Sequence, residues 1–278
     1  MRIVNLIENT EGSKGCAFAH GLSFYVETQR HRILMDLGPS EQTLENAEHL
    51  NIDLRSVDLV VLSHGHYDHS GGIMPFSALN AQAKIFMQNT AGGEYYADDG
   101  EQAPDGRYRY IGIDKNICKL PELITVEGDH VIDEETELFT VKNRTHPLPF
   151  TNKRLLVLRN GAYERDGFEH EHFLLVRENG KSVLLSGCAH NGILSILDAY
   201  REKYGKLPDL VISGFHLMVK REYRENEKEE VRAIANELKK YPVKFYTCHC
   251  TGTEAYELMK EVMGEQLSYV HSGDEILF

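Results

Sequence analysis

The chain has 278 residues, of which 41% are hydrophobic, 26% charged and 9% aromatic. This composition is typical of a folded globular protein and excludes collagen, coiled coil and disorder of the whole chain. The 30 basic and 43 acidic residues give a formal charge of −13, which repels nucleic-acid backbones and anionic membranes. We expect neither as a partner. A small anionic substrate still fits, because a bound dication or a few basic side chains can invert the field inside a cleft.

The start of the chain and its cysteines predict a cytoplasmic protein. The first residues turn acidic at Glu8, and the chain contains no apolar run of the length that a signal peptide or a membrane helix requires. The five cysteines are an odd and sparse set, which argues against a disulfide framework; they are Cys16, Cys118, Cys188, Cys248 and Cys250. The oligomeric state is not predicted.

In the first half of the chain, short apolar runs predict strands at 2–7, 22–27, 32–36 and 58–63, with an amphipathic helix at 40–50. The segment around 89–116 follows no period, although it is rich in glycine and tyrosine. We expect it to be an insertion packed on the surface or a loop over a site.

The second half repeats this pattern. Strands are predicted at 155–158, 173–176, 182–186, 209–213 and 243–247, two of them joined across Glu178-Asn179-Gly180, and helices at 193–204 and 225–241. Two β-rich halves, each covered by helices, predict an α/β (α+β) fold in four layers, αββα, with two sheets face to face. No linker or repeat divides the chain, so we expect one domain over 1–278.

The densest group of chemically active side chains follows the strand at 58–63. The run Ser63-His64-Gly65-His66-Tyr67-Asp68-His69 places three histidines and an aspartate within six residues. Imidazole nitrogen and carboxylate oxygen are the ligands that zinc and similar metals take. His64 and His66 can point to one side, and the Asp68-His69 pair lies one turn further on, where it can serve a second ion. A histidine-rich exposed turn is the weaker alternative.

Other strand ends supply further candidate ligands. His190, His216 and His249 each stand where a polar loop leaves a predicted buried strand, a usual location of site residues. We predict His190 and His249 as metal ligands and leave His216 open between a ligand and a substrate contact. Side chains alternate along a strand, so either His249 or its two flanking cysteines should face inward; we choose His249.

The run from His64 to Gly72 resembles the H-x-H-x-D-H signature of the metallo-β-lactamase fold superfamily. The resemblance extends over nearly the whole chain, through Glu8-Asn9 and through the segments 20–23, 33–72, 187–193, 214–217 and 249–252. These segments are similar to a subgroup named for 7,8-dihydropterin-6-methyl-4-(ribofuranosyl)aminobenzene 5′-phosphate synthase, which includes many proteins called only metal-dependent hydrolases. The resemblance implies the four-layer sandwich of the metallo-β-lactamase type and two divalent metal ions, zinc first, with iron or manganese as alternatives.

Carried over residue by residue, the resemblance implies His64 and His66 as ligands of the first ion, and Asp68, His69 and His249 as ligands of the second.

The chain departs from the family pattern in two places. Lactamase-type members place a bridging aspartate where Cys188 follows Gly187 here, so either Cys188 binds as a thiolate or His190 turns in. The usual third-motif histidine precedes the strand at 173–176, where His170 or His172, or neither, fills that position.

These features favour a metal-dependent hydrolase that activates water on a small substrate, with a phosphorylated substrate as one option. Asp68 is the candidate catalytic residue, because a metal-bound carboxylate can orient that water and pass its proton to the leaving group. Basic side chains near the site would bind the phosphate; the candidates are Lys220-Arg221, Arg107 and Arg109, although ordinary surface charge is the simpler interpretation.

Three other functions stay open. The subgroup implies a condensation that joins carbon to nitrogen with loss of diphosphate. A mononuclear iron dioxygenase agrees with the ligand types, whereas His66 replaces the glutamate of the flavin-linked di-iron type. A non-enzymatic binding module is disfavoured because His64, His66, Asp68 and His69 are all present.

Overall fold

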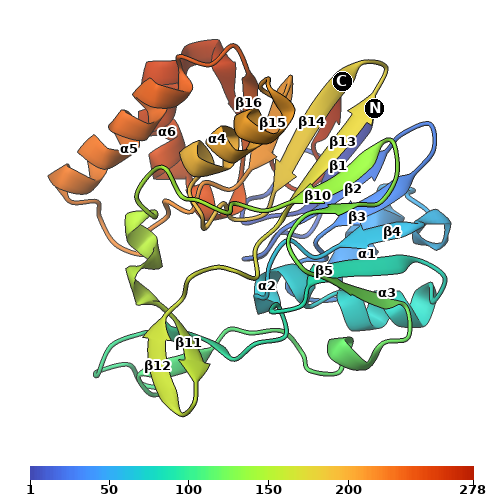
Figure 1. The fold of residues 1–278 in the computed structure, drawn as a ribbon, viewed down its shortest axis with the longest axis horizontal. Helices are drawn as coiled ribbons and strands as arrows, with labels where there is room; N and C mark the ends of the chain where they lie inside the picture. Colours follow the sequence, from blue (N-terminus) through green and yellow to red (C-terminus); the bar gives the residue numbers. More distant parts are fainter.

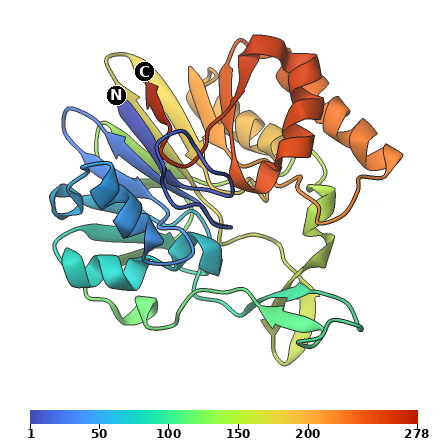
Figure 2. The same cartoon turned by 180° about the vertical axis from the view of Figure 1, so that it is seen from behind.

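The computed structural model describes residues 1–278. Two sheets lie face to face, and helices cover the outer side of each (Figure 1). Seen from behind, the two helical layers lie on opposite flanks of the paired sheets (Figure 2). The four-layer αββα sandwich expected from the sequence is therefore confirmed.

The first sheet has seven strands in the order β18-β1-β2-β3-β4-β5-β8. Its strands are β1 (Arg2–Ile7), β2 (Ser23–Glu27), β3 (Arg32–Met35), β4 (Leu59–Val61), β5 (Lys84–Gln88), β8 (Leu123–Val126) and β18 (Glu275–Leu277). From β3 to β8 the strands run parallel. The outer helices are α1 (Gln42–His49) and α3 (Ile73–Leu79), and the short α2 (Tyr67–Ser70) lies at the end of the sheet.

The second sheet also has seven strands, in the order β17-β16-β15-β14-β13-β10-β9. They are β9 (His130–Val131), β10 (Thr136–Phe139), β13 (Phe173–Glu178), β14 (Lys181–Ser186), β15 (Leu210–Ser213), β16 (Lys244–Thr247) and β17 (Leu267–Tyr269). Strands β14 to β17 run parallel. Its helices are α4 (Ile193–Tyr204), α5 (Glu225–Leu238) and α6 (Thr253–Met263).

The apolar runs of the sequence are continuous because these strands are buried on both faces. In β13, Leu174 faces the other sheet, whereas Phe173 and Leu175 pack against the helices. This alternation follows from the two-residue period of a strand. The Asn179-Gly180 turn joins β13 to β14 as predicted, with both residues at positive φ.

A third, four-stranded sheet projects from the sandwich, in the order β12-β11-β6-β7 (Figure 1). Its strands are β6 (Tyr95–Asp98), β7 (Tyr108–Tyr110), β11 (Leu155–Arg159) and β12 (Ala162–Arg165). We call it the small sheet. The segment 89–116 thus contains two strands, and the predicted strand at 155–158 pairs with β6 rather than with the second sheet. The sequence did not predict the small sheet, because each of its strands is too short to show a hydrophobic period and the pairing joins segments that are far apart in the sequence.

Five short 3₁₀ helices complete the fold: η1 (Leu54–Ser56), η2 (Ile117–Lys119), η3 (Phe150–Arg154), η4 (His249–Thr251) and η5 (Gly264–Gln266). The predicted helices at 40–50 and 193–204 correspond to α1 and α4, and the one at 225–241 ends at Leu238 as α5. None of the helices is long and apolar enough to cross a membrane.

Candidate metal centre

Four loops bring the predicted site residues together at one end of the two sheets. Each loop follows the carboxyl end of a strand, namely β4, β14, β15 or β16, all of which belong to the parallel parts of their sheets. In such sheets these ends form the usual binding crevice. The residues delivered are His64, His66, Asp68 and His69 after β4, Cys188 and His190 after β14, His216 after β15, and His249 after β16.

One group of ligand atoms, which we call the His64 cluster, consists of His64, His66 and His190. Their side-chain nitrogens lie within 4.8 Å of one another, and Nε2 of His64 is 3.3 Å from Nε2 of His190. All three side chains are buried, and Nε2 of His66 has no hydrogen-bond partner. The family pattern left His190 uncertain. In the structure His190 lies beside His64 and His66, the two histidines of the first motif.

A second group, the Asp68 cluster, consists of Asp68, His69 and His249. Oδ2 of Asp68 lies 3.5 Å from Nε2 of His249 and 3.8 Å from Nε2 of His69. The two imidazole Nε2 atoms are 3.3 Å apart. His20 lies at the open side of this cluster, with Nε2 3.4 Å from the same carboxylate oxygen.

The Nδ1 atoms of four of these histidines are held by oxygen acceptors. The pairs are His64 with Ser63 Oγ at 2.7 Å, His69 with Asp36 Oδ2 at 2.6 Å, His190 with Asn152 Oδ1 at 3.0 Å, and His249 with Asn9 Oδ1 at 2.8 Å. Because the Ser63 hydroxyl donates to Asp36, it must accept from His64. The network therefore places the proton on Nδ1 and leaves Nε2 as the free ligand atom.

This arrangement fits a bound cation. In the His64 cluster the Nε2 lone pairs of His64 and His190 face each other at 3.3 Å, and no hydrogen bond can form between two unprotonated nitrogens. In the Asp68 cluster the Nε2 atoms of His69 and His249 are equally close. A metal ion between the rings would accept both lone pairs. Imidazole, carboxylate and thiol side chains are the ligand types of zinc and related metals.

The protonation states of the clusters follow from burial and from the neighbouring charges. Burial, together with the surrounding histidines, lowers the pKa of His64 and His190 well below the ordinary value and that of His66 to about 3. These rings are neutral at pH 7 and can bind metal.

The Asp68 cluster holds two charged groups. Burial alone would raise the pKa of Asp68, but the charge of His69 and the neighbouring imidazole of His249 outweigh it and hold that pKa well below the ordinary value. Burial likewise opposes protonation of His69, yet Asp36 and Asp68 raise its pKa to about 9. The Nε2 proton of His69 must therefore leave before that nitrogen can bind an ion.

Backbone conformation at the loop ends explains one wrong prediction. His249 has a φ of 49° and begins η4 instead of continuing β16. Strand alternation therefore does not hold beyond Cys248, and both His249 and Cys250 line the cavity. Only Cys248 turns into the core between the sheets. His216 and Ala189 share this left-handed conformation, a form of strain that concentrates at functional sites.

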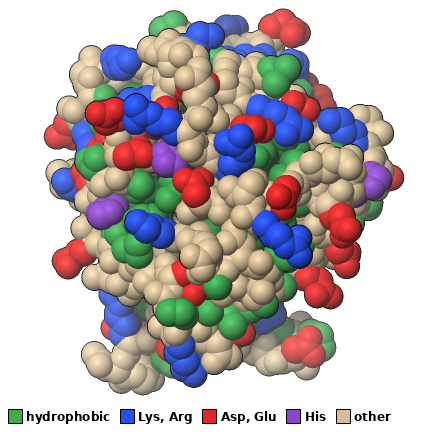
Figure 3. Space-filling model, turned by 90° about the vertical axis from the view of Figure 1, so that its right-hand side faces the viewer, with side chains coloured by type: hydrophobic (Ala, Val, Ile, Leu, Met, Phe, Trp, Pro, Cys, Tyr) green, Lys and Arg blue, Asp and Glu red, His purple; other side chains and the backbone are tan.

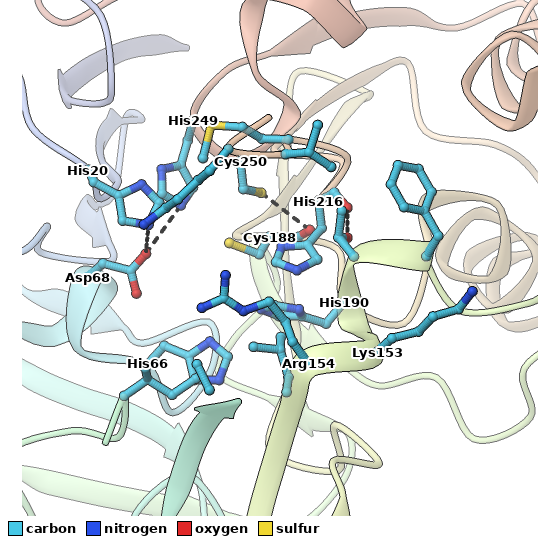
Figure 4. Close-up of a pocket in the computed structure, with 18 of the residues that line it drawn as sticks. His20, His66, Asp68, Lys153, Arg154, Cys188, His190, His216, His249 and Cys250 are labelled. Atoms are coloured by element: carbon cyan, nitrogen blue, oxygen red, sulfur yellow. Dashed lines mark hydrogen bonds and ion pairs between the residues drawn. The ribbon is translucent and has the colours of Figure 1, made fainter. Parts of the chain in front are cut away.

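Cys188 lies between the two clusters. Its Sγ is 3.2 Å from Nε2 of His69, and it lies within 4.8 Å of ligand atoms of His64 and His190 in one direction and of His249 in the other. In Figure 4 this sulfur points into the space between Asp68 and His190. Burial raises the pKa of the thiol well above its ordinary value.

The two third-motif candidates have other partners. His170 accepts from the Gly65 backbone at one nitrogen and pairs with Asp166 at the other. His172 contacts Gln88 and the Leu62 carbonyl. With both ring nitrogens engaged, neither side chain offers a free ligand atom; His170 instead fixes the backbone between His64 and His66.

His216 reaches the cavity from the β15 loop. Its ring centroid is 4.1 Å from that of His190, and its buried Nδ1 has no partner. It therefore stays a candidate for contact with substrate or metal.

Sequence reasoning missed the residues that orient the ligands. Asp36 accepts hydrogen bonds from the Ser63 amide, the Ser63 hydroxyl and His69. The side-chain oxygens of Asn9 and Asn152 accept hydrogen bonds from His249 and His190, respectively. The available signals were the position of Asp36 at the end of a buried strand, and the Glu8-Asn9 pair, to which no role was given.

The clusters open into a cavity of about 650 Å³ (Figure 4). Its walls carry six basic side chains against three acidic ones, although the whole chain is strongly acidic. We call these the basic rim: Arg109, Lys153, Arg154, Lys220, Arg221 and Arg224. On the face in Figure 3, by contrast, acidic and basic side chains are interspersed. The cavity therefore attracts anions locally.

The members of the rim differ in their partners. Arg221 is paired with Glu227, and Arg109 with Asp99. Lys153, Lys220 and Arg224 form no ion pair in the structure. Of the four basic residues proposed from sequence, only Arg107 lies away from the cavity, where it pairs with Asp98 and Glu101.

Comparisons with known proteins agree with this geometry. A family model of the metallo-beta-lactamase superfamily matches residues 18–146. The chain is 28% identical to the 7,8-dihydropterin-6-methyl-4-(beta-D-ribofuranosyl)-aminobenzene-5′-phosphate synthase of Methanocaldococcus jannaschii, over 100% of this chain and 97% of the relative.

Two solved structures extend the comparison. Tm1679, a metal-dependent hydrolase of the beta-lactamase superfamily, is 29% identical with a TM-score of 0.81, over 100% of this chain and 99% of that one. Zn²⁺-bound PqqB from Methylobacterium extorquens shares the fold at 13% identity and a TM-score of 0.55, over 100% of both chains. The sandwich and these matches together show that the chain has the metallo-β-lactamase fold, and the histidine motif lies within the residues that the family model matches.

Proposed function

We propose that this protein is a hydrolase that holds two divalent ions of the zinc type and acts on a small phosphorylated substrate. The observation that carries the proposal is the pair of ligand clusters with facing Nε2 atoms beside a basic rim. His64, His66 and His190 would hold one ion, and Asp68, His69 and His249 the other. When bound, the ions would supply Lewis acidity, which activates water and polarises a substrate oxygen.

The side chains of the chain itself have separable tasks. Asp68 has one oxygen engaged with His20, His69 and His249, whereas its Oδ1 makes no hydrogen bond. Oδ1 can orient the attacking water, accept its proton and pass that proton to the leaving group. The unpaired cations of the rim, Lys153, Lys220 and Arg224, can bind the phosphate of the substrate and hold the scissile bond over the clusters.

The test begins with metal analysis of gently purified protein, followed by assays on phosphodiester, lactone and thioester substrates. We expect about two ions per chain. His64→Ala and Asp68→Ala should each reduce bound metal and lower hydrolysis by more than about a hundredfold, the upper end for loss of an outer-shell partner. The control His49→Ala changes an exposed histidine on α1. Hydrolysis unchanged in both cluster variants would refute the proposal.

A condensation with loss of diphosphate is the second candidate. Two observations favour it: the similarity to a named synthase extends over the full chain, and the basic rim is suited to a diphosphate leaving group. In this case Oδ1 of Asp68 would accept the proton of the attacking amine. Turnover of a pterin diphosphate with an arylamine, without activity on the hydrolytic panel, would select this reaction.

Metal identity tests the remaining enzyme alternative. Iron as the bound metal, at one ion per chain, together with sulfite formation from a persulfide, would replace both proposals with a mononuclear iron dioxygenase. Zinc at two ions per chain would reject that alternative.

A further inference from the structure

We propose that the thiolate of Cys188 bridges the two metal ions, so that the two clusters form one sulfur-linked centre. This inference rests on the proposed dinuclear site but assigns an additional ligand and a metal preference to it. The position of one atom carries it. Sγ of Cys188 lies within 4.8 Å of ligand atoms of His64 and His69, of His190 and His216, and of His249 and Cys250.

Cys188 is 3% exposed, and its sulfur is 3.2 Å from Nε2 of His69. Close packing holds the loop in place: a Cβ at Gly187 would collide with the Ser63 hydroxyl, so this residue must be small. The left-handed turn at Ala189 then lets Cys188 and His190 reach the same cavity.

An independent observation indicates that this space is suited to a ligand. Nε2 of His66 and Nδ1 of His216 are buried, and neither has a hydrogen-bond partner. Buried polar atoms are rarely left unpaired without a functional reason. Both rings line the same cavity as the Cys188 sulfur.

The neighbouring Cys250 differs from Cys188 in orientation, although its Sγ also lies within 4.8 Å of the ligand atoms of Cys188 and His249. Its Sγ points back to the Cys188 carbonyl at 3.6 Å and packs against Gly214, where a Cβ would approach it at 2.5 Å. In Figure 4 a dashed line joins the Cys250 sulfur to the Cys188 carbonyl oxygen. Cys250 is therefore a matched control: it is as buried as Cys188 and lines the same cavity, but its sulfur contacts the Cys188 carbonyl.

Bridging requires no oxidation or reduction. The Cys188 thiol releases its proton to solvent, and its sulfur forms one bond to each ion. A soft thiolate favours zinc and cobalt over manganese, which prefers oxygen ligands. The chain should therefore discriminate against manganese more strongly than a variant with a carboxylate at position 188.

The test uses the full chain loaded with zinc or with cobalt. X-ray absorption of the zinc protein should show sulfur at about 2.3 Å, with one sulfur per zinc ion because each ion shares the bridge. The cobalt protein should show a strong near-ultraviolet sulfur-to-metal absorption. Both signals should disappear in Cys188→Ser and Cys188→Asp and persist in Cys250→Ser.

Cys188→Asp also provides a test that does not depend on a spectroscopic signal. A carboxylate can bridge without sulfur, so this variant should still bind two ions, with its preference for zinc over manganese reduced by at least about tenfold. Circular dichroism checks that each variant is folded.

The outcomes separate this inference from the function on which it rests. A zinc-loaded protein without a sulfur signal, or a signal lost in Cys250→Ser alone, would overturn the bridge while leaving the hydrolase proposal intact. One sulfur for every two zinc ions would show a terminal ligand and would also overturn it. A wild-type chain that binds no metal would instead refute the proposed function.

Discussion

The two ligand clusters and the basic rim line the same cavity but are built differently. The clusters consist of buried side chains at strand ends, each fixed by its own hydrogen-bond partner. The rim comes from η3, the small sheet and the segment that leads into α5, and several of its cations have no partner. The chemistry is thus tied to the core of the fold, whereas substrate choice depends on segments that can change without disturbing it.

Substitution of Asp36 should have the largest effect on stability and on metal affinity. This carboxylate accepts a hydrogen bond from His69 and, through the Ser63 hydroxyl, also positions His64. Asp36→Ala leaves the Ser63 amide, the Ser63 hydroxyl and His69 without their acceptor in a fully buried position. We expect a loss of about 3 kcal/mol in the free energy of unfolding and a 10- to 100-fold loss of metal affinity, roughly the effect of an outer-shell partner.

Denaturant titration and metal titration measure the two effects of Asp36→Ala. The exposed Asp105 forms no ion pair and provides the control, Asp105→Ala. Metal affinity equal to wild type in Asp36→Ala would contradict this prediction, because it would show that the clusters bind metal without this hydrogen-bond acceptor.

Changes in the rim should affect substrate binding alone. Lys153→Ala and Lys220→Ala each remove an unpaired cation from the cavity wall, and each should raise KM for an anionic substrate roughly tenfold, the scale of one hydrogen bond to a charged group. We expect kcat and bound metal to stay near wild type. Lys239→Ala, at the end of α5, is the control. Loss of metal in either rim variant would contradict the separation of rim and clusters.

His31 lies outside the clusters and the rim, where it pairs with Asp58 and Asp133. It tests whether the stability of the fold depends on pH at a place away from the cavity. Burial lowers the pKa of His31, but hydrogen bonds to Asp58 and Asp133 outweigh it and raise the pKa above its ordinary value. A raised pKa stabilises the fold below about pH 6.5, and this contribution is lost as the pH rises through the folded-state pKa.

We therefore expect His31→Gln to cost about 1 kcal/mol at pH 6 and close to nothing at pH 9. Asp133 keeps its charge throughout this range, since its pKa is lowered to about 2. Denaturant melts at the two pH values measure the difference, and metal content should not change. A larger cost at pH 9 would contradict the sign of this prediction.

The smallest effect is expected in the small sheet. The rings of Tyr108 and Tyr163 stack with centroids 3.9 Å apart, and both are partly exposed. Tyr163→Ala should cost less than about 1 kcal/mol and should accelerate hydrogen exchange in β11 and β12 without affecting the clusters. Loss of protection in β14 or β16 would show that the small sheet and the sandwich unfold together.

The sequence predicted those parts of the molecule that have a repeating or dense signal. The apolar runs predicted four of the seven strands of each large sheet, and the run from His64 to His69 indicated the candidate site. The orienting residues Asn152 and Asp36 carry no such signal, because each is a single polar residue whose role depends on a fold contact with a distant segment. The pair His249 and Cys250 was misjudged because a left-handed backbone residue cannot be deduced from alternation.

The rim and the small sheet were hard to predict for a different reason. Charged residues are common on every surface, so Lys153 could not be distinguished from its neighbours without knowing that η3 borders the cavity. The strands β6 and β11 are separated by more than fifty residues and pair only because the intervening chain returns to the same place.

Asp36 touches both clusters at once. It holds His69 directly and His64 through the Ser63 hydroxyl, so ordering of one ring restricts the other. Capture of the first ion should therefore prepare the second binding position, and the two ions should load cooperatively. In native mass spectra taken during a zinc titration, we expect chains with no ion and chains with two, with few half-filled molecules between them.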